Sequence, residues 1–286
     1  MNMKHIQKGR TLIIPDIHQN LWFANKCLNY DFDHVIFIGD LFHTSFDIDS
    51  KQIFGCAATC EWINQKFYEL GNRAIWLCGN HDIAQVASYN KNYKTTSPNP
   101  NYYCTGWTRN SAKTFNKLIN PYWFESLELC CKVGDFVVSH AGFHYSFFSP
   151  YKNEIDNIDN IYKIWEKDKF DFRFNGGHWI WTTGKGRDEY SVYDAGSPVW
   201  CDFHEEFEPL DETQQIVGHT ASPEWLIQLI KSKNGLLNFN LDSSQEMCMI
   251  WDNGELIFIN VKNDFCYRFI SSDNEDGYIL ERTYLG

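Results

Sequence analysis

Five short apolar segments of this chain end in the same way, with a potential metal ligand following directly or after one glycine. The segments are residues 11–15, 34–38, 73–78, 136–139 and 215–217, and the residues that follow are Asp16, Asp40, Asn80, His140 and His219. Each segment has the length of a strand, is rich in β-branched or aromatic residues and lacks helical periodicity. Because ligands of α/β sheets bind beyond the carboxyl ends of strands, this pattern predicts one site built from several strand ends.

Helix-like segments lie between these strands. Residues 21–29 form a short one, residues 56–70 end before Gly71, a suitable C-cap, and residues 106–119 stop before Pro121. Strands that alternate with helices predict an α/β fold in which the sheet is largely buried.

The C-terminal part has a different pattern. Residues 247–251 and 255–261 flank the turn sequence Asp-Asn-Gly and predict a β-hairpin, and residues 265–270 are a further candidate strand. Residues 89–103 are rich in Asn, Ser, Thr and Pro and predict a long surface loop. The aromatic and charged region 151–211 gives no clear pattern.

The residue types at the strand ends suit divalent metal ions. Imidazole and carboxylate together favour ions such as zinc, manganese or iron over a calcium or magnesium cage. Asp16 and His18 are two residues apart, so an extended backbone would point both side chains to one side. Asp40 has two carboxylate oxygens and could bridge two ions. A pair of ions can hold a phosphoryl group between them and activate a water molecule.

The motifs together resemble those of the calcineurin-like metallophosphoesterases. That family has D-x-H, G-D, G-N-H-D/E, a histidine and G-H in this order. The matching motifs here are Asp16-Ile-His18, Gly39-Asp40, Gly79-Asn-His-Asp82, Ser139-His-Ala-Gly142 and Gly218-His-Thr220. Each motif is short and weak alone, whereas five in the correct order over residues 16–220 are specific.

The resemblance implies a fold, a pair of ions and a role for each site residue. The fold would be a β-sandwich of mixed sheets flanked by helices. One ion would be held by Asp16, His18 and Asp40, and the other by Asp40, Asn80, His140 and His219. Manganese is the expected metal, with iron, zinc, cobalt and nickel as alternatives. His81 would serve as a general acid, and Asp82 would orient His81 or stabilise its loop.

Two branches of the family compete. The spacing to His219 and the sequence Pro198-Val-Trp-Cys-Asp202 resemble the serine/threonine phosphatases, especially their bacterial and phage members. That branch has G-D-x-x-D-R-G and R-G-N-H-E, whereas this chain has His43, Thr44 and Cys78 at the differing positions. The run from Gly39 to His43 instead resembles the DNA-repair nucleases, but Ala221 replaces the second histidine of their G-H-x-H motif.

A phosphate-binding cation is needed where the phosphatase arginines are missing. We expect Arg187 to contact the phosphate, because the guanidinium group binds oxyanions through two hydrogen bonds. Arg173, Lys185 and Arg109 are the competing candidates, and an ordinary solvent-exposed role remains the alternative for all four.

The sequence therefore predicts a phosphoesterase with two metal ions. It would hydrolyse a phosphomonoester, in a phosphoprotein, a nucleotide or a small phosphate, by in-line attack of metal-bound hydroxide. A phosphodiesterase or nuclease using the same metals is the first alternative, and a non-catalytic binding scaffold is the second. A scaffold would be expected to have lost some ligands, whereas all six are present in this chain.

Composition limits the partners and the location. The formal net charge of −12 argues against extended nucleic-acid binding, because phosphate backbones favour Lys and Arg. No apolar run approaches the roughly 20 residues that span a bilayer, and residues 1–10 lack the apolar core of a signal peptide. We expect a cytoplasmic protein without a membrane partner, whose ten cysteines are reduced.

Length sets the expected domain organisation. We expect one domain over residues 1–286, with a variable insertion around residues 143–211 that covers the substrate site. The sequence leaves the oligomeric state open.

Overall fold

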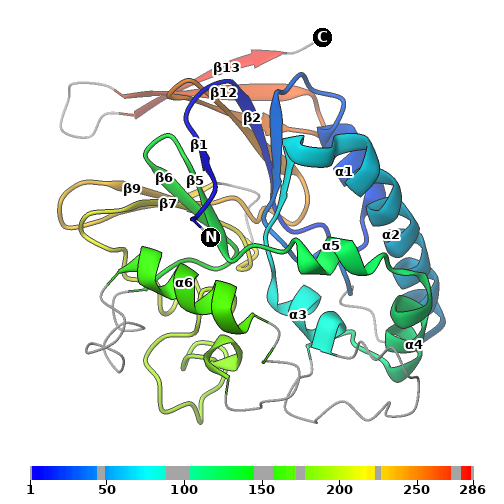
Figure 1. The fold of residues 1–286 in the computed structure, drawn as a ribbon. Helices are drawn as coiled ribbons and strands as arrows, with labels where there is room; N and C mark the ends of the chain where they lie inside the picture. The colour runs from blue at the N-terminus through cyan, green and yellow to red at the C-terminus, as the bar shows by residue number, and fades with distance from the viewer. Residues whose placement is uncertain are drawn as a thin grey trace.

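Two β-sheets pack face to face, and helices cover the outside of the sandwich (Figure 1). The computed structural model describes residues 2–43, 49–87, 104–144, 157–169, 171, 178–222, 227–271 and 278–284. The predicted long loop at residues 89–103 lies outside these ranges. The predicted β-sandwich of mixed sheets flanked by helices is confirmed.

The first sheet has seven strands within the described residues, in the order β13-β12-β11-β10-β2-β3-β4. Strands β2, β3 and β4 are parallel, and the remaining pairs are antiparallel. The strands in chain order are β2 (Arg10–Ile14), β3 (His34–Phe37), β4 (Ala74–Trp76), β10 (Met247–Asp252), β11 (Glu255–Asn260), β12 (Phe265–Ser271) and β13 (Tyr278–Tyr284). The predicted hairpin is β10–β11, and the further candidate strand is β12.

The second sheet has six strands within the described residues, in the order β1-β5-β6-β7-β9-β8. Strands β6, β7 and β9 are parallel to one another. The strands in chain order are β1 (His5–Ile6), β5 (Cys130–Val133), β6 (Phe136–Ser139), β7 (Gln214–Val217), β8 (Gln228–Lys231) and β9 (Leu237–Asn240). The five segments predicted from the sequence are β2, β3, β4, β6 and β7, and they divide between the two sheets.

The alternation of side chains along the strands builds two cores. Ile13 of β2 and Ile36 of β3 lie in the core between the sheets, where they join residues such as Val138 of β6. Leu12 and Val35 point the other way, into the core beneath the helices. Successive strand residues face opposite sides, so the apolar runs of β2 and β3 are buried on both faces, as expected of parallel strands.

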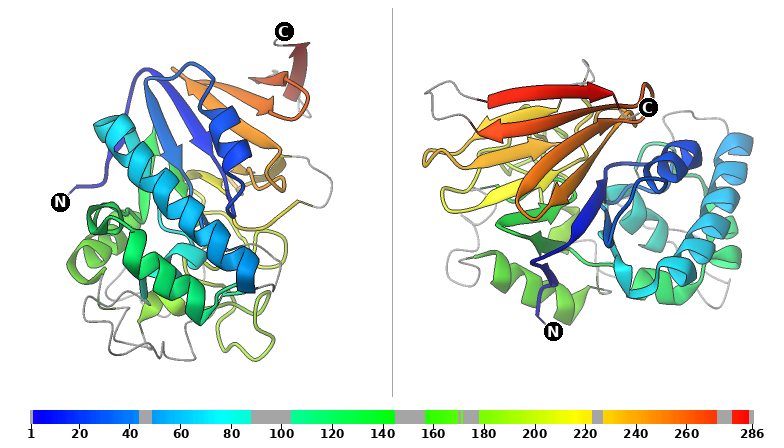
Figure 2. Two further views of the ribbon diagram at one scale, coloured as in Figure 1. Left: turned by 90° about the vertical axis from the view of Figure 1, so that its right-hand side faces the viewer. Right: turned by 90° about the horizontal axis from the view of Figure 1, so that it is seen from above.

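The outer face of β2, β3 and β4 is covered by a layer of helices. The helices are α1 (Leu21–Cys27), α2 (Asp49–Leu70), α4 (Arg109–Leu118) and α5 (Pro121–Glu125). Trp62 of α2, Phe115 of α4 and Trp123 of α5 share one core with the strand residues, and Figure 2 shows α2 and α4 side by side over this sheet. Gly71, predicted as a C-cap, follows the last residue of α2 with φ +52°.

Several elements escaped the sequence analysis. Helix α3 (Asn80–Ala87) begins shortly after β4 ends at Trp76, and α2 begins at Asp49 rather than at residue 56. The region without a clear pattern contains α6 (Ile158–Asp168), capped by the Asn157 side chain, and a short 3-10 helix, Trp179–Trp181. Among the described residues, no helix combines the length and apolar character that crossing a membrane requires.

Candidate active site

The predicted ligands lie at the carboxyl ends of five strands, and the two sheets share them. Asp16 follows β2, Asp40 follows β3 and Asn80 follows β4, all in the seven-stranded sheet. His140 follows β6 and His219 follows β7 in the six-stranded sheet. The site therefore lies at one edge of the sandwich where the ends of both sheets come together.

The backbone at these strand ends is tightly turned. His18, Asp40, His43 and His219 have φ values of 45°, 49°, 61° and 71°, in the left-handed region that non-glycine residues seldom adopt. The expected extended backbone between Asp16 and His18 is therefore wrong at His18. Backbone conformations of this kind cost energy and cluster at functional sites, where the surrounding structure fixes them.

Two glycines allow this close packing. A Cβ atom at Gly79 would collide with the Asp40 carboxylate, and a Cβ atom at Gly218 would collide with the carboxylate of Asp16. These two motif glycines thus make room for a carboxylate from another strand end.

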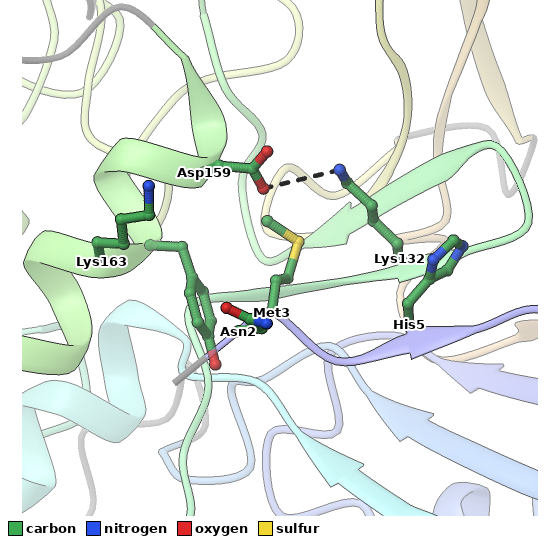
Figure 3. Close-up of a pocket in the computed structure, with 7 residues that line it drawn as sticks. Asn2, Met3, His5, Lys132, Asp159 and Lys163 are labelled. Carbon is green, nitrogen blue, oxygen red and sulfur yellow. Dashed lines mark ion pairs between the residues drawn. The ribbon is translucent and has the colours of Figure 1, made fainter.

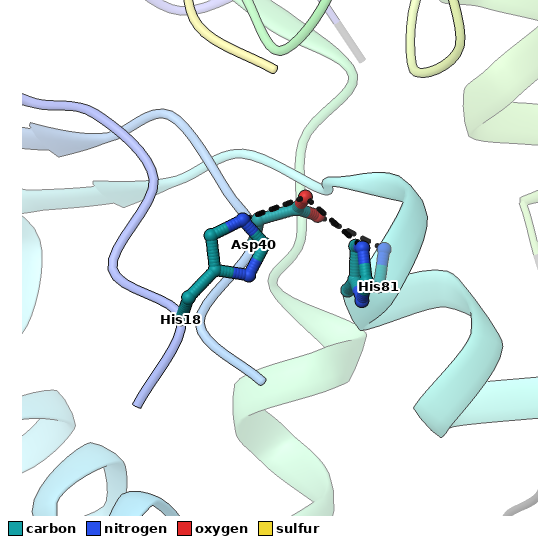
Figure 4. Close-up of side chains that lie close together, drawn as sticks. All are labelled: His18, Asp40 and His81. Atoms are coloured by element: carbon teal, nitrogen blue, oxygen red, sulfur yellow. Dashed lines mark hydrogen bonds and ion pairs between the residues drawn. The ribbon is translucent and has the colours of Figure 1, made fainter. Parts of the chain in front are cut away.

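The carboxylate of Asp40 is the centre of the cluster. Its Oδ2 atom lies 3.7 Å from His18 Nε2 and 3.9 Å from His81 Nε2 (Figure 4). Its Oδ1 atom accepts a hydrogen bond of 2.9 Å from the backbone amide of His81. His18 Nδ1 donates to the carbonyl oxygen of His43 at 2.9 Å, which leaves the Nε2 lone pair directed at the cluster.

A second group of ligand atoms lies on the other side of Asp40. His140 Nε2 is 3.5 Å from Asp40 Oδ2, and it is 3.1 Å from both Asn80 Oδ1 and His219 Nδ1. Within the described ranges, the histidine and carboxylate atoms that could share an ion form two groups. The groups are His18 with Asp40 and His81, and Asp40 with His140 and His219.

The spacing of the second group suits a metal ion. The Asn80 oxygen faces only acceptor atoms, and the amide would have to be turned over to donate to His140, His219 and Asp40. Atoms bound to one ion lie about 3 Å apart when metal–ligand distances are about 2.0–2.2 Å. The separations of 3.1–3.5 Å therefore suit a shared cation.

The carboxylate of Asp16 is held at the site by the backbone amide of His219. Both of its carboxylate oxygens accept from the His219 amide, at 3.1 and 3.0 Å, and Asp16 belongs to neither group of ligand atoms above. Burial, followed by the charge of Asp242, raises the pKa of Asp16 to about 7. Asp242 is a buried acidic neighbour that the sequence analysis did not single out, since it follows β9 without a recognised motif.

The charges of the cluster are strongly interdependent. Burial alone would raise the pKa of Asp40, but His140 and His81 hold it well below its usual range. Burial would likewise lower the pKa of His140, whereas Asp40 and Asp16 raise it to about 9. Positive charge is therefore stabilised beside Asp40, at the position where an ion would bind.

Comparison with known proteins identifies the family. The family model for the calcineurin-like phosphoesterases matches residues 9–223, three quarters of the chain. The chain belongs to the calcineurin-like phosphoesterases. The predicted family is thus confirmed, and the chain is a metal-dependent hydrolase with candidate metal-binding residues in place. No curated protein is similar enough in sequence to count as a relative.

Two solved structures share the fold, and a third is less similar. A cold-active protein-tyrosine phosphatase from a psychrophilic Shewanella species has 16% sequence identity and a TM-score of 0.53, over 91% of this chain and 80% of that one. A second structure of a cold-active protein-tyrosine phosphatase gives the same identity and TM-score over 91% and 79%. A metallophosphoesterase from Sphaerobacter thermophilus has 14% identity and a TM-score of 0.42, over 88% and 87%.

In this calcineurin-like phosphoesterase, His81 is linked to a chain of hydrogen bonds. His81 Nδ1 lies 3.0 Å from His43 Nδ1, and His43 Nε2 lies 2.8 Å from Gln85 Oε1. Burial lowers the pKa of His43 to about 4, so its ring is neutral and carries one hydrogen. If Nε2 donates that hydrogen to Gln85, His43 Nδ1 accepts from His81 and leaves the Nε2 lone pair of His81 facing Asp40.

Gln85 was missed because helix α3 was missed. It lies four residues after His81, so the helix brings the two side chains to one face. His43, which departs from the phosphatase motif, is fully buried and contacts His81 directly.

Asp82 contacts the backbone of the phosphoesterase loops. Its two oxygens accept from the amides of Leu41, at 2.9 Å, and Gly79, at 3.1 Å. Asp82 is fully buried, and burial followed by Asp40 raises its pKa to about 7. These contacts tie the loop that carries Asp40 to the turn before Asn80, so Asp82 lies where it can support both ligands.

Arg187 is the candidate cation that the structure places beside the cluster. Its Nε lies 3.0 Å from Asp202 Oδ2, and one terminal nitrogen donates to Thr220 Oγ1 at 3.0 Å and to the His219 carbonyl at 3.4 Å. Lys185 pairs with Asp194, and Arg109 begins helix α4. Arg173 and Thr44 lie outside the described residues.

Cys78, at the position of a phosphatase arginine, is fully buried, and its backbone amide donates to the carbonyl of Glu128.

A separate cavity of about 330 Å³ lies beside the N-terminal strand (Figure 3). Lys132, Lys163 and Asp159 line it, and its lining includes none of the predicted ligands. This cavity is therefore separate from the histidine and carboxylate cluster.

The contacts of Asp82 predict a stabilising role. Asp82→Asn turns one acceptor into a donor that faces a buried backbone amide, so we expect a loss of about 1–3 kcal/mol in the free energy of unfolding. Denaturant unfolding measures this, and the exposed Asp135→Asn variant should stay within about 0.5 kcal/mol of the unmodified protein. Unchanged stability in Asp82→Asn would contradict the support role.

Proposed function

We propose that this calcineurin-like phosphoesterase hydrolyses a phosphomonoester with two divalent ions. The observation that supports this most is the convergence of ligand atoms on Asp40 from two sides, with His18 on one side and His140, His219 and Asn80 on the other. The formal net charge of −12 would repel a phosphate, so the attraction has to come from local positive charge.

The two metal ions would supply positive charge for the phosphoryl oxygens and activate the attacking water. We propose that Asp16, His18 and Asp40 hold one ion, and that Asp40, Asn80, His140 and His219 hold the other. A ligand set of imidazole, carboxylate and amide oxygen suits manganese, with iron, zinc, cobalt and nickel as alternatives.

The chain's own residues would bind and orient the substrate. His81 lies at the rim of the cluster, with its Nε2 atom 3.9 Å from Asp40, and could donate a proton to the leaving oxygen once doubly protonated. Asp202 and Thr220 hold the guanidinium group of Arg187, which would contact a phosphate oxygen. We propose one domain over residues 1–286, with the region 143–211, which contains Arg187, as its substrate-covering insertion.

A second candidate is a phosphodiesterase or nuclease that uses the same metals. The observation that favours it is the direct contact of His43 with His81, since His43 belongs to the run that resembles the nuclease branch. A non-catalytic scaffold is disfavoured because the sequence retains all six predicted ligand residues and four of them lie in the two candidate groups around Asp40.

A substrate screen separates these candidates. The purified protein, supplemented with manganese, is assayed on phosphotyrosine and phosphoserine peptides, mononucleotides, cyclic nucleotides and single-stranded DNA. The phosphotyrosine peptide is included because a solved structure with the same fold is named a protein-tyrosine phosphatase. Faster cleavage of diesters than of every monoester would overturn the proposed monoesterase activity in favour of the second candidate.

Asp40→Asn tests the metal centre. The variant removes the charge on which both groups of ligand atoms converge, so we expect bound manganese and hydrolysis to be lost together. Elemental analysis after gel filtration gives the metal content, and Asp135→Asn serves as the surface control. Full metal content and normal turnover in Asp40→Asn would sink the assignment.

His81→Ala tests the proposed acid. The variant should keep its metal ions but hydrolyse substrate about 10²–10⁴-fold more slowly, as expected for a lost general acid. A substrate whose leaving group needs no proton should recover much of the rate. Loss of one ion would instead show that His81 is a metal ligand, and an unchanged rate would rule out a role in proton transfer.

Arg187→Ala tests the proposed phosphate contact. Losing a hydrogen-bonded charge should lower kcat/KM by about 10–100-fold, because such interactions contribute about 1.5–3 kcal/mol. KM should rise, and the metal content should stay unchanged. Lys185→Ala, in the same loop, is the matched control, and equal effects of the two variants would rule out a specific contact for Arg187.

A further inference from the structure

Two of the ten cysteines each make one hydrogen bond with a backbone carbonyl and one with an amide side chain of the site. The thiol of Cys104 donates to the backbone carbonyl of Asn80 at 3.1 Å and accepts from Asn80 Nδ2 at 3.5 Å. The thiol of Cys56 donates to the carbonyl of Ser111 at 3.3 Å and accepts from Gln85 Nε2 at 3.5 Å. Both cysteines are buried.

A thiol has a single hydrogen, and this decides what it can do for the amide. When that hydrogen is donated to a backbone carbonyl, only sulfur lone pairs remain for the side-chain amide. The amide then turns its NH₂ group towards the sulfur and its oxygen away from it. Cys104 thereby directs Asn80 Oδ1 towards His140 Nε2, 3.1 Å away.

The opposite orientation of Asn80 competes with metal binding. With the amide turned over, its nitrogen would donate to His140 Nε2 and His219 Nδ1 at 3.1 Å and to Asp40 Oδ2 at 3.0 Å. In that orientation an N–H group occupies the direction in which an ion would be bound. Cys104 therefore favours the orientation of Asn80 that can act as a ligand.

The same logic applies to Cys56 and the histidine pair. Because Gln85 Nε2 donates to Cys56, its oxygen faces His43 Nε2 at 2.8 Å and can only accept from it. His43 Nδ1 is then the acceptor for His81 Nδ1, 3.0 Å away. Cys60, one helical turn from Cys56, can donate a further hydrogen bond to the Cys56 sulfur. Gln85 Nε2 still donates to Cys56 in that case.

We propose that the buried thiols of Cys56 and Cys104 are positioning groups that fix the orientation of Gln85 and Asn80. Cys104 thereby turns the Asn80 oxygen towards the position of one ion. Cys56 thereby determines that His43 donates to Gln85 and accepts from His81. The proposal rests on the proposed metal site and deepens it. It also accounts for two of the cysteines without any disulfide or zinc site.

Metal titration tests the role of Cys104 without an activity assay. Mn²⁺ is titrated calorimetrically into the metal-free protein, and Cys104→Ala should weaken one binding event by about tenfold, the lower end for residues that orient ligands. Cys104→Ser keeps one donor hydrogen and a lone pair and should restore most of the affinity. Cys131→Ala, a buried cysteine in the core between the sheets, controls for the loss of packing.

The outcomes separate the proposals. If the unmodified protein binds no Mn²⁺, the proposed function fails. If it binds Mn²⁺ and Cys104→Ala behaves like Cys131→Ala, the metal centre stands and the thiol proposal is overturned for Cys104.

Histidine NMR tests the role of Cys56. In metal-free protein with ¹⁵N-labelled histidine, His43 should carry its hydrogen on Nε2 alone. Cys56→Ala should allow Gln85 to turn and give a mixture of the two tautomers, whereas Cys56→Ser should keep the single form. An unchanged His43 spectrum in Cys56→Ala, with Cys131→Ala as the reference, would overturn the proposal for Cys56.

Discussion

The buried carboxylate of Asp40 is the interaction on which the rest of the site depends. It lies between His18 and His81 on one side and His140 on the other, and the His81 backbone amide holds one of its oxygens. A buried charge needs partners of opposite charge or hydrogen-bond donors. The surrounding histidines keep this carboxylate ionised, and the turn at Gly79 and the contacts of Asp82 hold its loop in place.

The sandwich explains how these partners meet. Histidines from the six-stranded sheet reach a carboxylate from the seven-stranded sheet because both sheets place the ends of parallel strands at the same edge. The apolar cores above and below β2 and β3 hold the strands rigidly. The loops at the strand ends can therefore adopt left-handed backbone conformations that would be costly on a mobile segment.

Several polar side chains around the cluster are buried. Asn80, His43, Gln85 and Asp82 are buried, and each has a partner that limits its orientation. Such networks are stabilising when every member is satisfied and costly when one is not. In this phosphoesterase the thiols of Cys104 and Cys56 are partners of Asn80 and Gln85, which gives a physical reason for cysteines beside the candidate metal site.

The five strands, the order of the ligand motifs and the family could be predicted from the sequence alone, because periodicity and short motifs are local properties. The sequence did not show that Asp40 and His140 belong to different sheets or that Asp82 supports two loops. It also did not show that Cys104 contacts Asn80, or that Cys56 and Gln85 are linked through His43 to His81. These contacts join residues up to 100 positions apart, such as Asp40 with His140. Only tertiary packing decides them, since it depends on how separate strand ends and helices are brought together.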